Sequence, residues 1–242
     1  MDALRGIAIV WMTVFHFCFD LAHFGWLHAN FLADPFWTVQ RSAIVSLFLF
    51  TAGLGQAIAL RQRLGWPRCW RRWAQVAGCA LLVTAGSALM FPRSFIYFGV
   101  LHGLACMLVV VRLTGGWGRW LWPAGAVAIA LPWLAAQGLQ GSGWETIAQT
   151  LNGRALNWLG LVTRKPFTED YVPLLPWLGV LWWGMAAGQW LLRHRPAWLG
   201  VALPLPGRAL AGLGRWSLSW YMLHQPVLIG LVAGVGALTG HT

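Results

Sequence analysis

The sequence is poor in charged residues, and poorest in acidic ones. Of its 242 residues, 10% are charged, six are Asp or Glu, and 58% are apolar. A soluble domain carries about a quarter charged residues, so this chain has too few polar side chains to cover a globule in water. High hydrophobicity also excludes intrinsic disorder, which needs the opposite composition. The sequence therefore predicts a protein that lies in a lipid bilayer.

Cysteine is scarce as well, and the basic residues form no single patch. Four cysteines without paired spacing exclude a disulfide scaffold and a zinc framework. The net charge of +11 comes from residues that stand between apolar runs. Basic residues in such places set membrane orientation, so membrane lipid is the expected partner and nucleic acid is not.

Long apolar runs dominate what is present. A membrane-spanning helix needs about 20 mostly apolar residues. Seven runs meet this length, at about 4–27, 42–60, 73–91, 94–112, 119–137, 174–192 and 214–236. The first has no small-residue cleavage site and is expected to be a permanent helix rather than a signal peptide. We predict an all-α, polytopic helical bundle with a single domain over residues 1–242.

The arginines predict how this bundle is oriented. Counted on alternating sides of the seven runs, twelve of the seventeen basic residues fall on one side. The positive-inside rule then places the N-terminus in the cytoplasm and the C-terminus outside. The longest loop, at about 138–173, would face outside, and its Glu145–Leu159 part has the apolar spacing of a helix on the membrane surface.

Glycines four residues apart recur inside three of the runs. The pairs are Gly99 with Gly103, Gly184 with Gly188, and Gly230 with Gly234. Small residues at this spacing let two helices approach closely in lipid. They predict helix packing.

Three histidines lie inside predicted helices, where an ionisable group is costly. His16, His102 and His224 stand nine to eleven residues from the nearest arginine on the expected cytoplasmic side. That separation is roughly 14–16 Å, half of a ~30 Å hydrocarbon core. Their common depth favours one buried site near the midplane, provided that the first, fourth and seventh helices are neighbours. The alternative is three structural histidines bonded to nearby carbonyls or serines.

Asp20 follows His16 by four residues and therefore lies on the same helical face. A carboxylate there can accept the imidazole N–H and fix its tautomer, as a general base or nucleophile requires. An aspartate that only ties two helices together is the alternative. With His23 the pair has weak metal-ligand spacing, and no metal is predicted. Haem held by His16 with His102 or His224, or a proton-coupled carrier, is the rival function.

Other polar side chains accompany the last predicted helix. Tyr221 and Gln225 flank His224, and Pro226 removes a backbone donor just beyond it. Before the sixth helix, Asp170 stands among prolines that would stiffen the rim of a pocket. These residues predict a polar cavity.

The same segments carry a family resemblance. The stretch from Asp2 to Leu21, with Arg5 and His16, resembles the first helix of the bacterial heparan-alpha-glucosaminide N-acetyltransferase-like membrane proteins. Asp-Tyr-x-Pro-Leu-Leu-Pro-Trp at 170–177 and Ser-Leu-x-x-Tyr-x-x-His-Gln-Pro at 217–226 are similar to later motifs of that family. Arg5 and His16 also resemble the arginine–histidine signature of the wider transmembrane acyltransferase superfamily. The chain is shorter than the lysosomal enzyme and starts four residues before Arg5. A segment upstream of Met1 is therefore expected to be missing from this sequence.

The resemblance implies transfer of an acetyl or other acyl group from cytosolic acyl-CoA to a sugar amine or hydroxyl, in a bacterial inner membrane. His16 would be the general base, with Asp20 orienting it, or the nucleophile of an acetyl-histidine intermediate. His102, Asp170, Tyr221, His224 and Gln225 would line the pocket. A homo-oligomer is left open. Arginines could hold the CoA phosphates, although topogenic charge explains them about as well. They are Arg5, Arg61, Arg63, Arg68, Arg71 and Arg72.

Overall fold

The computed structural model describes residues 1–140, 143–199 and 201–240, and the chain is helical over most of these ranges. Its β-structure there is an isolated bridge between Phe98 and Tyr171. The predicted all-α class is confirmed. The chain forms two compact units, Met1–Phe48 with Val201–Thr242, and Leu49–Gly200.

Within the described residues, five segments are long and apolar enough to cross a membrane. They are α1 (Asp2–His23), α2 (Pro35–Arg61), α3 (Trp66–Met90), the continuous η1 and α5 segment (Gly115–Gly138), and α9 (Ser217–Thr239). Two further predicted runs also form helices, α4 (Val100–Leu113) and α7 (Leu174–His194). Neither belongs to these five, and α4 has only 14 residues.

The exposed surface of these helices is apolar, as lipid requires. On α3, Leu81 is 68% and Leu89 is 85% exposed, and on α9 Leu238 is 89% exposed. In contrast, His224 on α9 is 8% and Asp20 on α1 is 2% exposed. These two polar groups are buried while leucines of the same helices are exposed, which is the reverse of a soluble protein and the arrangement that a bilayer favours.

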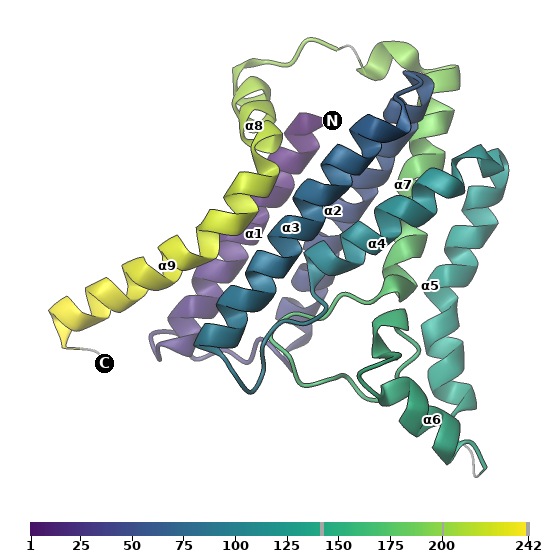
Figure 1. Ribbon diagram of the computed structural model, residues 1–242. Helices are drawn as coiled ribbons and strands as arrows, with labels where there is room; N and C mark the ends of the chain where they lie inside the picture. Colours follow the sequence, from purple (N-terminus) through teal and green to yellow (C-terminus); the bar gives the residue numbers. More distant parts are fainter. Residues whose placement is uncertain (141–142, 200, 241–242) are drawn as a thin grey trace. The chain divides into compact units, whose positions relative to one another are not determined.

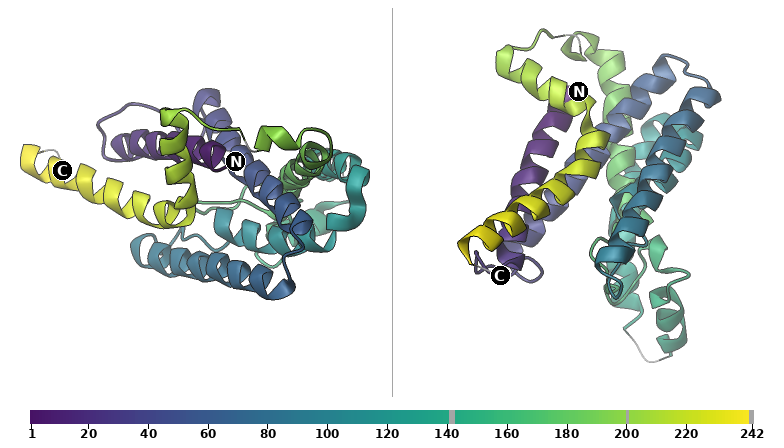
Figure 2. Two further views of the ribbon diagram at one scale, coloured as in Figure 1. Left: turned by 90° about the horizontal axis from the view of Figure 1, so that it is seen from above. Right: turned by 60° about the vertical axis from the view of Figure 1, so that its left-hand side comes forward.

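In the first unit, α1 packs against α8 (Leu205–Arg215) and α9 (Figure 1). Figure 2 shows α8 lying across α1 near its first residues. Gly6 makes this possible, since a Cβ there would collide with the carbonyl oxygen of Leu210. Beyond the crossing, the core consists of Met12, Phe15, Phe31 and Ile44.

The helix α8 was not predicted, and the last apolar run starts later than expected. The expected segment was 214–236, whereas α8 ends at Arg215 and α9 begins at Ser217. Pro206 stands in the first turn of α8, where its missing N–H costs nothing. The apolar residues and arginines of α8 give it one apolar face, which covers the start of α1.

In the second unit, α5 and α7 lie side by side, and α4 packs against both α3 and α7 (Figure 1). The side chain of Trp182 on α7 donates to the hydroxyl of Thr114 over 2.9 Å. Gln189, two turns later, donates to the carbonyl of Gly115 over 2.8 Å. These bonds fix α7 to the turn between α4 and α5.

The predicted helix at 94–112 begins only at Val100. Residues 94–99 are not helical, and part of their backbone bonds the segment before α7. Glu169 N–H donates to the Ser94 carbonyl over 2.9 Å, and the Thr168 hydroxyl donates to the Phe95 carbonyl over 2.8 Å. The backbone of 94–99 is thereby partly satisfied without a helix.

The longest loop, at about 138–173, also differs in detail from its prediction. The helix expected over Glu145–Leu159 is α6 (Glu145–Asn152), followed by a short 3-10 turn, η2 (Asn157–Leu159). The chain turns away because the Asn152 side chain accepts hydrogen bonds from the backbone N–H groups of Thr163 and Arg164. Residues 141–142 of this loop lie outside the described residues.

One of the three glycine pairs packs two helices, as predicted, whereas Gly99 precedes α4 and its partner Gly103 lies against the segment before α7. A Cβ on Gly184 would collide with the backbone of Phe50 on α2, and one on Gly188 would come within 2.7 Å of Ala57. Gly103 lies against the carbonyl of Val172. Gly230 and Gly234 have no heavy atom of the described chain within 4 Å of their Cβ positions, so their prediction was wrong.

Candidate functional site

The first unit brings two of the three predicted histidines together. His16 on α1 and His224 on α9 meet with Nδ1 and Nε2 2.9 Å apart. The aromatic ring of Phe15 lies edge-on to the His16 ring, with centroids 5.7 Å apart, and Tyr221 lies 5.8 Å from the His224 ring. The pair is therefore held in aromatic surroundings on two adjacent helices.

The backbone of α9 determines which ring nitrogens carry protons. Nδ1 of His224 lies 2.8 Å from the carbonyl oxygen of Tyr221 and 3.2 Å from that of Trp220. A carbonyl only accepts, so Nδ1 of His224 must be the donor. In the neutral ring Nε2 is then an acceptor, and it takes the proton of His16 Nδ1. This leaves a lone pair on Nε2 of His16, to which the described residues offer no hydrogen bond.

Asp20 is buried one turn beyond His16, and its described hydrogen bond goes to α9. The Gln225 side-chain amide donates to Oδ1 of Asp20 over 2.7 Å. Oδ2 of Asp20 and Oε1 of Gln225 are buried with no partner among the described residues. Two unpaired acceptors side by side are costly, and a ligand donor would satisfy them. The expected orienter of His16 therefore bonds Gln225, and His224 fixes the His16 ring.

Arg5 lies on the same helix as His16, at a distance of about 16 Å from it along the helix axis. Its guanidinium donates to Asp2 over 3.1 Å. The Trp220 indole donates a hydrogen bond to the Thr13 hydroxyl over 2.9 Å. This bond joins α9 to α1 about one turn before the two histidines. This contact had no signal in the sequence, since Thr13 is an isolated hydroxyl in an apolar run.

His102 and Asp170 lie together at the start of α4, in the second unit. Gly99 N–H donates to Nδ1 of His102 over 3.3 Å, so the opposite nitrogen carries the proton and donates to Thr84 over 3.0 Å. Asp170 accepts from the N–H of Val100 over 2.8 Å. Both side chains satisfy the exposed backbone donors of a helix N-terminus.

The long loop that precedes α7 is held by a pair of tyrosines. Tyr171 donates to the Asn157 carbonyl over 2.6 Å, and the Asn157 amide donates to the Tyr97 hydroxyl over 2.7 Å. Burial, with a smaller contribution from Tyr97, raises the pKa of Tyr171 above its ordinary value. An open hollow of about 630 Å³ lies within the same loop, between α6 and Thr163.

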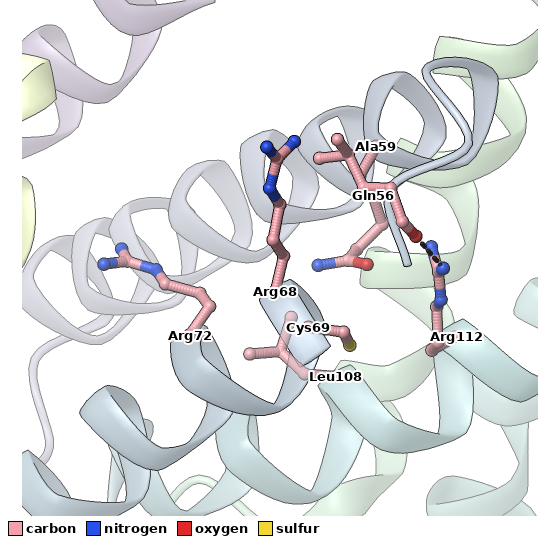
Figure 3. Close-up of a pocket in the computed structure, with 8 residues that line it drawn as sticks. Gln56, Ala59, Arg68, Cys69, Arg72, Leu108 and Arg112 are labelled. Carbon is pink, nitrogen blue, oxygen red and sulfur yellow. Dashed lines mark hydrogen bonds between the residues drawn. The ribbon is translucent and has the colours of Figure 1, made fainter. Parts of the chain in front are cut away.

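A second cluster, the arginine cavity, lies at the other end of α4. It has a volume of about 140 Å³. Figure 3 shows Arg68 and Arg72 of α3, Arg112 of α4 and Gln56 of α2 around it. The other lining residues are Ala59, Leu64, Cys69 and Leu108. Of the arginines predicted to hold phosphates, Arg68 and Arg72 line it, while Gln56 and Arg112 were not predicted.

Metal ligation has no geometric support in the described ranges, where no group of three or more His, Cys, Asp or Glu could hold an ion. The four cysteines are free.

Comparison with protein families gives one match. The family model described as "Heparan-alpha-glucosaminide N-acetyltransferase, catalytic" matches residues 1–226. The matched range begins with α1 and ends directly after His224 and Gln225. No curated protein and no solved structure matches the chain.

Proposed function

Because the chain belongs to the heparan-alpha-glucosaminide N-acetyltransferase catalytic family, we propose that it is a membrane acyltransferase that uses acyl-CoA as donor. The acceptor would be the amine or hydroxyl of an amino sugar or glycan. The observation that carries the proposal is the His16–His224 pair, because it leaves Nε2 of His16 with a lone pair in buried surroundings.

His16 would act at that nitrogen. In direct transfer, Nε2 takes a proton from the acceptor amine or hydroxyl as this group attacks the thioester carbonyl. The new C–N or C–O bond forms, the C–S bond breaks, and the CoA thiolate leaves and takes up a proton. In the two-step alternative, Nε2 itself attacks the thioester carbonyl, the C–S bond breaks and the CoA thiolate leaves. The acceptor then attacks the acetyl group on His16, the bond from that group to Nε2 breaks, and the acceptor's proton passes to the thiolate. Both routes need the same unprotonated nitrogen.

His224 would be a positioning residue. Its Nε2 holds the proton of His16 on Nδ1 and so keeps Nε2 of His16 free for reaction. Asp20 and Gln225 would line the pocket together with Tyr221. The unpaired Oδ2 of Asp20 and Oε1 of Gln225 can accept hydrogen bonds from an amine or hydroxyl donor. A sugar acceptor offers several such donors.

The orientation follows from charge. We propose seven spanning segments, the five long apolar segments with α4 and α7, with the N-terminus in the cytoplasm and the C-terminus outside a bacterial inner membrane. Twelve of the seventeen basic residues then face the cytoplasm. There they can meet the phosphates of acyl-CoA. The candidate phosphate ligands are Arg5, Arg61, Arg63, Arg68, Arg71 and Arg72.

The test is acyl transfer by the purified protein. Labelled acetyl-CoA is incubated with glucosamine and a panel of cell-envelope glycans, and products are identified by mass spectrometry. His16→Ala should lower the rate by about 100-fold or more, the usual contribution of a positioned base or nucleophile. His28→Ala, in an exposed loop of the same unit, is the matched control.

Two outcomes would contradict the proposal. Full activity in His16→Ala would remove His16 from the chemistry. A haem absorption band at near one haem per chain, with no transfer to any acceptor, would favour the rival histidine-ligated carrier.

A further inference from the structure

The helices around the arginine cavity carry positive charge without acidic residues. Between Pro35 and Trp144 the sequence contains nine arginines and no Asp or Glu. In the second unit the acids are Glu145, Glu169 and Asp170. Asp170 bonds the opposite end of α4, which is about 20 Å long, and Glu169 bonds Ser94 in the segment before that end. Among the described residues that line the cavity there is no acidic side chain, so the lining as a whole is positive.

Two of the polar side chains that line the cavity are held by other contacts. Arg112 donates to the carbonyl of Leu64, and its guanidinium lies over the Trp66 ring, 5.5 Å from the centroid. Arg72 donates to Gln75 over 3.3 Å, a long bond at the surface. The contacts of Arg112 fix a guanidinium at the edge of the cavity, in a defined position.

The other two polar side chains, Arg68 and Gln56, have N–H donors that are available to a ligand. The described residues give no hydrogen bond to the guanidinium of Arg68 or to the amide of Gln56, and both line the cavity. Arg68 and Arg72 are one helical turn apart and therefore project from the same face of α3. Guanidinium groups presented in this way suit the oxygens of a phosphate, which they can bind in pairs.

We propose that the arginine cavity binds a phosphate group, through Arg68 and Arg72 with Gln56, and with Arg112 adding fixed charge. Ligand pockets are typically 300–1,000 Å³, so a cavity of about 140 Å³ admits one such group and leaves the rest of the ligand outside. The source is the 3′-phosphate of the acyl-CoA donor, which rests on the proposed function, or the headgroup of an anionic lipid. This narrows the phosphate ligands to Arg68 and Arg72 and adds Gln56, which is uncharged.

The experiment measures binding apart from acyl transfer. Purified protein in phosphatidylcholine nanodiscs is titrated with adenosine 3′,5′-bisphosphate and with adenosine 5′-monophosphate, which lacks the 3′-phosphate, at about 0.15 M salt. Arg68→Gln and Arg72→Gln should each raise the Kd for the bisphosphate about 10- to 100-fold, the usual effect of losing a hydrogen bond to a charged group. The monophosphate should bind more weakly and respond little to either substitution.

A second arm tests the lipid source. Nanodiscs with and without phosphatidic acid are compared for thermal stabilisation of the protein, and the same two variants should lose any stabilisation. The matched control in both arms is Arg119→Gln, which removes one exposed charge from the loop after α4 without touching the cavity. Binding of the bisphosphate identifies the nucleotide as the source, and stabilisation by phosphatidic acid alone identifies the lipid.

Two results would overturn the cavity as a phosphate site. One is wild-type response of Arg68→Gln and Arg72→Gln in both arms. The other is an equal loss in Arg119→Gln, which would mean that general charge is responsible. Normal acyl transfer alongside either result would leave the proposed function intact. Conversely, bisphosphate binding that depends on Arg68, with no transfer to any acceptor, would refute the proposed function alone.

Discussion

Replacing His224 by alanine tests whether α9 sets the reactive nitrogen of His16. The substitution removes the acceptor that lies 2.9 Å from Nδ1 of His16. A buried donor left without its partner costs about 1–3 kcal/mol. The proton of His16 is then no longer held on Nδ1, so the tautomer with a free Nε2 loses this preference. If that energy is lost from the transition state, kcat falls by about 5- to 150-fold.

The assay is the initial rate of labelled acetyl transfer over a range of donor and acceptor concentrations. Because His224 acts through the His16 ring, the loss should appear in kcat, with a nearly unchanged KM for acetyl-CoA. His224→Gln keeps an oxygen near the position of Nε2 and should recover part of the rate. His28→Ala serves again as the control for loss of a histidine elsewhere in the unit.

A double-mutant cycle supplies the refuting result. If His224 works only by positioning His16, the variant that lacks both histidines should be no slower than His16→Ala alone. A double variant whose loss equals the product of the two single losses would mean that the histidines act independently. The proposed tautomer would then be wrong.

Further substitutions test other parts of the fold, each by thermal unfolding in detergent. Gln225→Leu removes the described donor to buried Asp20 and should destabilise the protein by about 1–3 kcal/mol. An unchanged Tm would mean that this hydrogen bond does not contribute to stability. Gly6→Ala forces the backbones of α1 and α8 apart where they cross and should lower the free energy of unfolding by about 1–3 kcal/mol. Gly234→Ala, which meets open space, should be tolerated. Equal effects of the two substitutions would contradict the close packing of α1 on α8. Burial raises the pKa of Tyr171, so the folded chain keeps its proton where the unfolded chain ionises, and stability should fall as pH rises above about 10. Tyr171→Phe should weaken this alkaline loss, and an identical pH profile would count against it.

The positions of the five long apolar segments were predictable because the length of an apolar run is a direct physical signal. The start of α4 was not. Residues 94–99 are nearly as apolar as the helix that follows, and their partners, Thr168 and Glu169, lie more than 70 residues away in the chain. The short helix α8 was missed because its 11 residues fall below the length of a span.

The candidate site shows the same division. Depth along a helix is local information, and it placed His16 and His224 correctly at one level. The hydrogen-bond partner of a side chain depends on tertiary structure. The spacing of Asp20 from His16 predicted that both lie on one face of α1, but the partner of Asp20 is Gln225 on the neighbouring helix α9. Gln56 had no signal at all, being an uncharged residue in an apolar run, although the spacing of Arg68 and Arg72 was visible.

The lining of the arginine cavity has a consequence for how pH acts on the protein. The described residues that line the cavity include no histidine and no carboxylate, and arginine stays protonated throughout the physiological range. Any change in phosphate affinity between pH 5 and 8 would therefore report the second ionisation of the ligand, near pH 6. Acidification through pH 6 would therefore weaken donor binding because the phosphate loses charge, while the charge of the cavity itself stays constant.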